Sequence, residues 1–240
     1  MTKMKRFLQK TYQEYKHMLL LLYFPIYLAW FVFLEQKVTT HFHVIHMDID
    51  DYIPIYEIFI IPYLLWFAYI AVVIIYMGFK DKSEFCKMCA FLFTGMTIFL
   101  IVSTVYPNGH NLRPISFERD NIFTQLCAML YQTDTATNLF PSIHVYNSIG
   151  VHLAIANSEK TKHNKLIRFG SGFLMVSIIL ATVFLKQHSM FDVITAFLLA
   201  IVMYFMVYVR SWENLLETAK RQKKRIKEEK EKLKKRLPEI

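Results

Sequence analysis

The chain has 240 residues, of which 55% are hydrophobic and 16% are Phe, Trp or Tyr, and its formal net charge is +9. Only 3 residues are Cys, which excludes a disulfide framework. Several apolar runs of about 18 residues carry almost no charge, and such runs are long enough to cross a bilayer. We therefore expect a polytopic membrane protein, and we expect no nucleic-acid partner because membrane topology accounts for the basic residues.

Six membrane-spanning helices are predicted, so the expected fold class is all-α. In chain order they fall at 17–35, 54–78, 88–106, 141–156, 167–185 and 191–209. Between the third and fourth lies the longest polar stretch, 107–139, in which the pattern predicts a short amphipathic helix at 121–131. Asp120 is its candidate cap, and its apolar side predicts that it lies in the membrane interface.

The basic residues fall unequally on the two sides of these spans. Of the 28 Lys and Arg residues, 24 lie on the side of both termini, and the other four are Lys37, Arg113, Arg119 and Lys186. The positive-inside rule therefore predicts that both termini are cytoplasmic, and we expect a plasma membrane. The expected domains are a basic N-terminus at 1–16, a six-helix membrane domain at 17–210 and a charged helical tail at 211–240 beside anionic lipid head groups.

Three short stretches on the predicted outer side combine residues that carry chemistry. They are 112–114, 140–144 and 186–192, and each lies where an apolar segment meets a polar loop. His188 and Asp192 are four residues apart, which places them on one face of a helix. A carboxylate there can accept the Nδ1 proton of the imidazole and leave Nε2 free as a nucleophile or base.

The stretch at 140–144 precedes a predicted span with an unusually polar side. Pro141 suits a first helical turn, and Ser142 with the free N–H groups of that turn forms a potential anion site. His144 and Ser148 share a stripe with His152, and polar groups in a membrane helix face the bundle interior or a water-filled cavity. We expect His144 to be functional and His152 to hydrogen-bond structurally between helices.

Taken in order, Arg113-Pro114, Pro141-Ser142-x-His144 and His188-x-x-x-Asp192 resemble the type 2 phosphatidic acid phosphatase (lipid phosphate phosphatase) superfamily. The resemblance covers roughly residues 17 to 210 and implies a nucleophilic His188 that forms a phosphohistidine. It also implies that Asp192 orients His188, and that His144 protonates the leaving oxygen and later activates the acceptor. Arg113, Ser142 and helix N–H groups would bind the phosphate, and the family needs no metal or other cofactor.

The sequence departs from the family pattern at three positions. Tyr106 stands where the family has Lys, Ile143 replaces the usual Gly, and Ala181-Thr182 replace Ser-Arg. Two expected phosphate cations are thus missing, which is costly for a transition state with charge spread over its oxygens. Lys186 and His110 are the candidate replacements.

This motif form resembles the branch of inositol phosphorylceramide synthases and sphingomyelin synthases. Hydrolysis of a lipid phosphate monoester or pyrophosphate is slightly preferred, and transfer of a phospho-head group to another lipid is the main alternative. A non-catalytic lipid-binding protein and a transporter are further alternatives, the last because intramembrane ionisable groups can relay protons. We expect the substrate to be a membrane lipid, but the motifs do not indicate which one. They also leave the oligomeric state open.

A second group of ionisable residues occupies the predicted outer loop at 36–53. It contains His41, His43 and His46, followed by three Asp residues, and such side chains could bind a divalent metal. On an extended segment His41 and His43 share a face that His46 does not. We therefore favour a solvated loop that packs over the mouth of the site.

Overall fold

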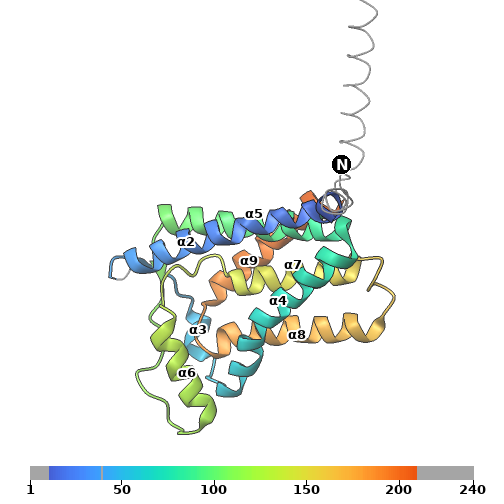
Figure 1. The fold of residues 1–240 in the computed structure, drawn as a ribbon. Helices are drawn as coiled ribbons and strands as arrows, with labels where there is room; N and C mark the ends of the chain where they lie inside the picture. The colour runs from blue at the N-terminus through green and yellow to red at the C-terminus, as the bar shows by residue number, and fades with distance from the viewer. Residues whose placement is uncertain (1–10, 39, 210–240) are drawn as a thin grey trace, which may run out of the picture.

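The computed structural model describes residues 11–38 and 40–209. The predicted tail at 211–240 and most of the predicted basic N-terminus lie outside these residues. The fold is an all-α bundle, as expected, and its long helices run between two ends of the molecule (Figure 1). The long elements are η1 (Lys16–Leu22), α2 (Tyr23–Lys37), α4 (Ile60–Lys80), α5 (Lys82–Val105), α7 (Ile143–Asn157), α8 (Lys165–Phe184), α9 (Met190–Tyr204) and the π-helical turn η3 (Phe205–Val209).

Within the described residues, five helical segments are long and apolar enough to cross a membrane. They are Thr11–Lys37, Glu57–Lys80, Lys82–Val105, Lys165–Phe184 and Met190–Val209. The predicted sixth span corresponds to α7, whose 15 residues give a length of roughly 22 Å against about 30 Å of hydrocarbon. Six membrane-crossing helices are therefore not confirmed, whereas the integral membrane character is clear.

α7 can be short and polar because the other helices shield it from the surroundings of the bundle. It packs against α4, α5, α8 and α9, and the Tyr146 hydroxyl donates to the Phe91 carbonyl of α5 at 2.8 Å. A Cβ on Gly95 or Gly150 would collide with the facing helix, so these glycines set the close approach of α5 and α7. α7 nevertheless connects the start of α9 to the start of α5, since Ser142 before its first residue contacts Asp192 and Ser158 after its last residue bonds Asp81.

The third long helix begins earlier than the sequence indicates. α5 starts at Lys82 instead of 88, because the Asp81 side chain caps it by accepting from the Glu84 N–H at 3.1 Å. The charged residues expected to form a turn thus belong to the first turns of α5. Glu84 is buried there and accepts from the Tyr208 hydroxyl at 2.8 Å, which explains how a charged segment can be helical inside the bundle.

Short elements connect the helices at the other end of the bundle. β1 (His43–Val44) pairs in parallel with β2 (Asn108–Gly109), and α3 (Asp48–Tyr52), η2 (Glu57–Phe59) and α6 (Ile122–Thr133) lie nearby. α6 confirms the expected short helix, but its cap is Asn121, which accepts from Phe123 and Thr124, and not Asp120. The Asp120 carboxylate instead accepts from the Gln125 amide.

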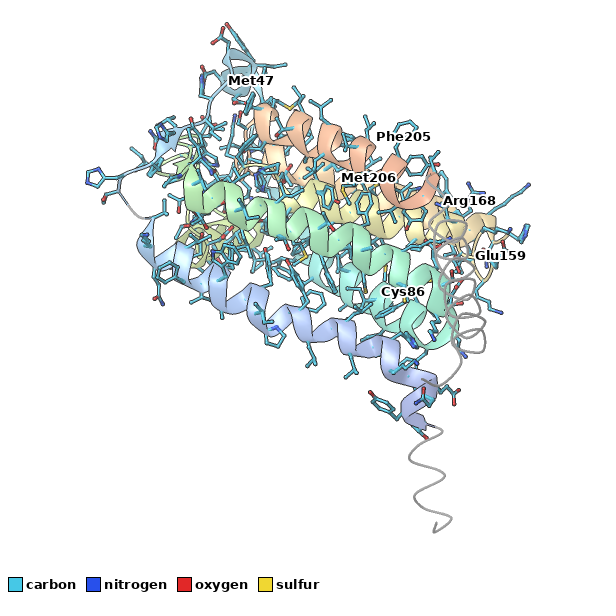
Figure 2. The ribbon with its side chains drawn as sticks, turned by 90° about the horizontal axis from the view of Figure 1, so that it is seen from above. Met47, Cys86, Glu159, Arg168, Phe205 and Met206 are labelled. Atoms are coloured by element: carbon cyan, nitrogen blue, oxygen red, sulfur yellow. The ribbon has the colours of Figure 1, made fainter. Side chains whose placement is uncertain are left out.

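Both ends of the described chain lie together, at the end opposite to these short elements. His17 contacts the Gly78 carbonyl at 2.8 Å, and Tyr208 bonds Glu84. Figure 2 shows Arg168 and Glu159 at this end and Met47 at the other. The arrangement agrees with an even number of passes through the bundle, and it gathers the three motif stretches at the end of α3 and α6.

Candidate active site

Two histidines and one carboxylate meet where α7 and α9 begin. His188 Nε2 lies 3.4 Å from His144 Nδ1, and His188 Nδ1 lies 3.3 Å from Asp192 Oδ2. The imidazole rings are inclined edge to face, with centroids 5.6 Å apart. The sequence stretches at 140–144 and 186–192 thus converge in space, and the i, i+4 spacing of His188 and Asp192 produces the expected contact.

The backbone around His188 fixes its direction. The N–H groups of Gln187 and His188 both donate to the Thr182 carbonyl, at 2.9 and 3.0 Å. This tight turn after α8 places Lys186 at φ 48°, in the left-handed region that non-glycine residues seldom adopt. Ser189 then caps α9, and the Asp192 Oδ2 atom accepts from the Ser189 N–H at 3.0 Å.

Burial sets the charge state of His188. Desolvation, aided by the positive charge of Arg113, lowers the pKa of His188 to about 3. The ring is therefore neutral at ordinary pH, and one nitrogen keeps a lone pair. With Nδ1–H directed at Asp192, that lone pair is on Nε2, which faces His144.

His144 packs against two aromatic rings of α4. Its ring stacks on Tyr63 with centroids 4.7 Å apart and packs against Trp66 at 4.3 Å. Ser148 satisfies its own hydroxyl by donating to the His144 carbonyl at 2.6 Å. This packing directs His144 Nδ1 at His188 Nε2, so α4 fixes the position of the histidine pair through its contacts with His144.

Ser142 joins the start of α7 to α9. It is fully buried, its side chain accepts from the Val145 N–H at 3.4 Å, and its own N–H donates to the Asp192 carbonyl at 3.3 Å. Pro141 therefore precedes the cap and does not lie in the first turn as expected. The N-terminus of α7 lies beside His144, where its dipole favours a negative charge.

Arg113 reaches the site from the loop before α6. Its Nη2 donates to the Gln187 side chain at 2.7 Å and to the Thr135 carbonyl at 3.1 Å, and Nη1 donates to the Asp134 carbonyl at 2.5 Å. The guanidinium also lies 4.8 Å from the centre of the Tyr131 ring. Burial raises the pKa of the neighbouring Asp134 to about 6, an effect that Arg113 opposes.

The two candidate replacement cations are both engaged by protein groups. His110 Nδ1 accepts from the Leu112 N–H at 3.2 Å, so Nε2–H donates to the Gln187 carbonyl at 2.9 Å. Burial lowers the pKa of His110 to about 4, which makes the ring neutral. Lys186 Nζ donates to the Asp50 carbonyl at 2.5 Å, and its pKa is lowered by burial.

Asp50 is a site residue that the sequence pattern did not single out. It is 2% exposed, and its carboxylate accepts from the Ser189 hydroxyl at 2.5 Å and from the Met190 N–H at 2.8 Å. It also accepts from the Met47 N–H at 2.8 Å. Asp50 thus ties α3 to the turn that carries His188, across a sequence separation of well over a hundred residues.

The other ionisable residues of that loop point elsewhere. His46 contacts Asp51 at 2.9 Å, and His43 stacks on Tyr106 with centroids 4.2 Å apart. In the part of the chain that the structure describes, no three His, Cys, Asp or Glu side chains are grouped to hold a metal ion. The loop packs over the turn that carries His188, through Asp50.

A largely apolar groove of about 710 Å³ leads to His144. It lies between α2 and α4, with α5 and α7 as its floor, and Asp134 and Asn147 are among the few polar residues along it. Its apolar walls include Phe24, Phe31, Trp66, Phe67, Ile70, Ala71, Ile74 and Met96. One end of a long apolar molecule lying in this groove would therefore meet the histidine pair.

A model of the PAP2 superfamily matches residues 118–216 of the chain. The matched segment contains Ser142, His144, His188 and Asp192, and it begins after Arg113. No curated protein and no solved structure matches the chain. Together with the apolar helices, the match fits a membrane protein of the lipid phosphatase type, and it agrees with the resemblance inferred from the motifs.

Proposed function

We propose that the chain is an integral membrane lipid phosphatase that hydrolyses a lipid phosphate monoester or pyrophosphate through a phosphohistidine. The observation that carries the proposal is the line of contacts from Asp192 through His188 to His144. A neutral, buried imidazole with a carboxylate on one nitrogen and an acid–base partner at the other suits nucleophilic catalysis.

In the first step, the His188 Nε2 lone pair forms a bond to phosphorus while the ester P–O bond breaks. The leaving oxygen takes a proton from His144, whose charged form is favoured by the bound phosphate. His188 becomes positively charged as it is phosphorylated, and the carboxylate of Asp192 stabilises that charge. Because the phosphoryl group must fit between the two nitrogens, the rings have to separate when substrate binds.

In the second step, water replaces the alcohol. His144 removes a proton from the water, whose oxygen bonds to phosphorus as the bond to His188 Nε2 breaks. Inorganic phosphate and the original enzyme result. The phosphate oxygens would be held by Arg113, Ser142 and the first N–H groups of α7, and Lys186 and His110 remain proposed contributors if they exchange their present partners for the phosphate.

The groove beside His144 supports a lipid as the substrate. Its apolar walls open between helices that belong in the hydrocarbon region, so a chain could enter from the membrane without crossing water. The charge distribution along the sequence supports a topology with this end of the bundle on the outer face and both termini cytoplasmic.

Head-group transfer is the second candidate. The motif form, with Ile143 and without an Arg in the third stretch, favours the inositol phosphorylceramide and sphingomyelin synthase-like branch. In that reaction a lipid hydroxyl takes the place of water, and the intermediate at His188 is a phosphodiester. A non-catalytic lipid-binding protein would keep the groove and lack turnover.

The test is an assay of purified protein in liposomes with EDTA present, which follows free phosphate and lipid products by mass spectrometry. The panel contains lipid phosphates, lipid pyrophosphates and phospholipids with a ceramide acceptor. His188→Ala is compared with His163→Ala, a histidine in the turn at the opposite end of the bundle. Phosphate release that His188→Ala abolishes and His163→Ala preserves is the expected result.

A new phospholipid without free phosphate would move the protein to the transferase branch. Trapping of ³²P on the wild type, stable to base and labile to acid, would place the phosphoryl group on a histidine. Turnover that His188→Ala leaves intact would refute the proposed nucleophile. No turnover on any lipid, with lipid binding retained, would refute the enzymatic function.

A further inference from the structure

A second groove lies at the end of the bundle opposite to the histidine pair. It has a volume of about 570 Å³ and is formed by the first half of α8 and the last part of α7. Figure 2 shows Arg168, one of its lining residues, at the end of the molecule opposite to Met47. This groove is separate from the proposed active site, and the inference drawn from it is independent of the proposed function.

Along α8, the lining of the groove changes from basic to apolar. Lys165 and Arg168 lie in the first turn, and Phe169, Phe173 and Val176 follow on the same side at helical spacing. Phe169 is 75% exposed and Phe173 67% exposed. Two cations therefore stand at the membrane edge of the bundle, and an exposed apolar track leads from them into the span.

His152 of α7 forms the floor of the groove. Its Nδ1 contacts the Ser171 hydroxyl at 3.0 Å, and Ser171 is bonded to Tyr69 at 2.6 Å, so the ring is fixed in place. Gly172 has no side chain to cover the ring. A Cβ at this position would lie only 3.3 Å from the ring, so a larger residue would close over it. The second ring nitrogen, Nε2, has no hydrogen-bond partner among the described residues and is available to a ligand.

Among residues 11–38 and 40–209, no acidic side chain lines this groove. Glu159 of the adjoining turn is paired with Lys162, and the Asp81 carboxylate before α5 accepts from the Ser158 hydroxyl. Within the part of the chain that the structure describes, no carboxylate in the groove compensates the charge of Lys165 and Arg168. A ligand that suits it carries a negative charge at one end and a hydrocarbon chain at the other.

We propose that this groove binds an anionic phospholipid of the leaflet at this end of the bundle. The phosphate contacts Lys165 and Arg168, and His152 Nε2–H donates to the head group. One acyl chain lies over Phe169 and Phe173. A basic pocket beside membrane helices favours an anionic head group over a zwitterionic one, whereas a soluble anion would leave the apolar track exposed.

The test titrates the purified full-length chain with phosphatidylglycerol or phosphatidylcholine and counts bound lipids by native mass spectrometry. The double variant Lys165→Gln/Arg168→Gln is compared with Lys160→Gln/Lys162→Gln, which removes the same charge from the adjoining turn. Removal of the two groove cations is expected to weaken phosphatidylglycerol binding about 30-fold and to leave phosphatidylcholine binding unchanged. The control variant is expected to bind both lipids as the wild type does.

Equal weakening by both double variants would show attraction to net charge alone and would overturn the site. Equal affinity of the wild type for the two lipids would overturn the head-group selectivity. Inorganic phosphate is added as a competitor at the concentration of the lipid. Complete displacement by phosphate would overturn the role of the apolar track, and retention of the lipid supports it.

Discussion

Asp50 provides the sharpest test of how the site is held together. In Asp50→Ala, the Ser189 hydroxyl and the Met190 N–H lose a buried carboxylate acceptor, and Met47 loses its partner as well. Hydrogen bonds to a charged group contribute about 1.5–3 kcal/mol each, and the carboxylate no longer has to be desolvated. We therefore expect a net loss of about 3 kcal/mol in the free energy of unfolding.

The catalytic effect of Asp50→Ala should exceed what partial unfolding explains. Ser189 follows His188 directly, so a freed turn displaces the proposed nucleophile, and a misplacement of about 1 Å costs on the order of a hundredfold in rate. We expect kcat to fall by roughly that factor at a temperature where the variant is folded, with little change in KM. Turnover and thermal unfolding are measured on the same detergent-purified sample.

Asp51→Ala is the matched control, because Asp51 is an exposed carboxylate of the same helix whose side chain bonds His46 and none of the groups that Asp50 holds. It should leave both measurements close to the wild type. Asp50→Glu keeps the charge and should restore part of the activity. Wild-type kcat in folded Asp50→Ala would refute the reasoning, as would an equal loss in Asp51→Ala.

Three further predictions concern His110, Arg113 and the apolar groove beside His144. The pKa of His110 falls from 6.5 in the unfolded chain to about 4 in the folded one, so the unfolded state binds more protons between these values. The thermal stability of the wild type should therefore fall as the pH drops from 6.5 to 4, and it should fall less steeply in His110→Gln. Equal slopes of stability against pH in the two proteins would contradict this. Arg113→Lys should lower kcat/KM at least tenfold because one ammonium cannot reproduce the forked contacts, whereas the same change at the exposed Arg119 should have little effect. Ala71→Trp should fill the groove, so that KM rises for a long-chain substrate but not for a water-soluble phosphate ester. Val72→Trp, on the lipid-facing side, should change neither KM value. An equal rise in KM for both substrates in Ala71→Trp would rule out the groove as the chain-binding site.

The sequence was sufficient for the features that depend on local pattern. Apolar runs located the long helices, and the four-residue spacing of His188 and Asp192 gave their contact. The count of six spans is not confirmed, because α7 has 15 residues and is not among the helices long and apolar enough to cross a membrane. The late start assigned to the third span has a long-range cause, since the buried partner of Glu84 is Tyr208, far along the chain.

The supporting residues of the site could not be found in this way. Asp50 lies in a run of three carboxylates, and nothing local distinguishes the buried one from its exposed neighbours. Tyr63 and Trp66, which hold His144, read as ordinary aromatic residues of an apolar span. Such contacts depend on which helices become neighbours in the fold. The spacing of residues along a single sequence does not indicate those neighbours.

The absence of two motif cations is easier to understand from the structure. Arg113 is positioned by backbone carbonyls and by Gln187, so its single charge is fixed before substrate binds. A fixed charge in a buried site stabilises a developing negative charge more effectively than a mobile one in water, because little reorganisation is needed. The N-terminus of α7 adds oriented N–H groups beside His144, and Lys186 is held 2.5 Å from the Asp50 carbonyl within the same turn. The proposed site would thus replace two flexible cations with one constrained guanidinium, a helix terminus and a lysine that also secures the turn carrying His188.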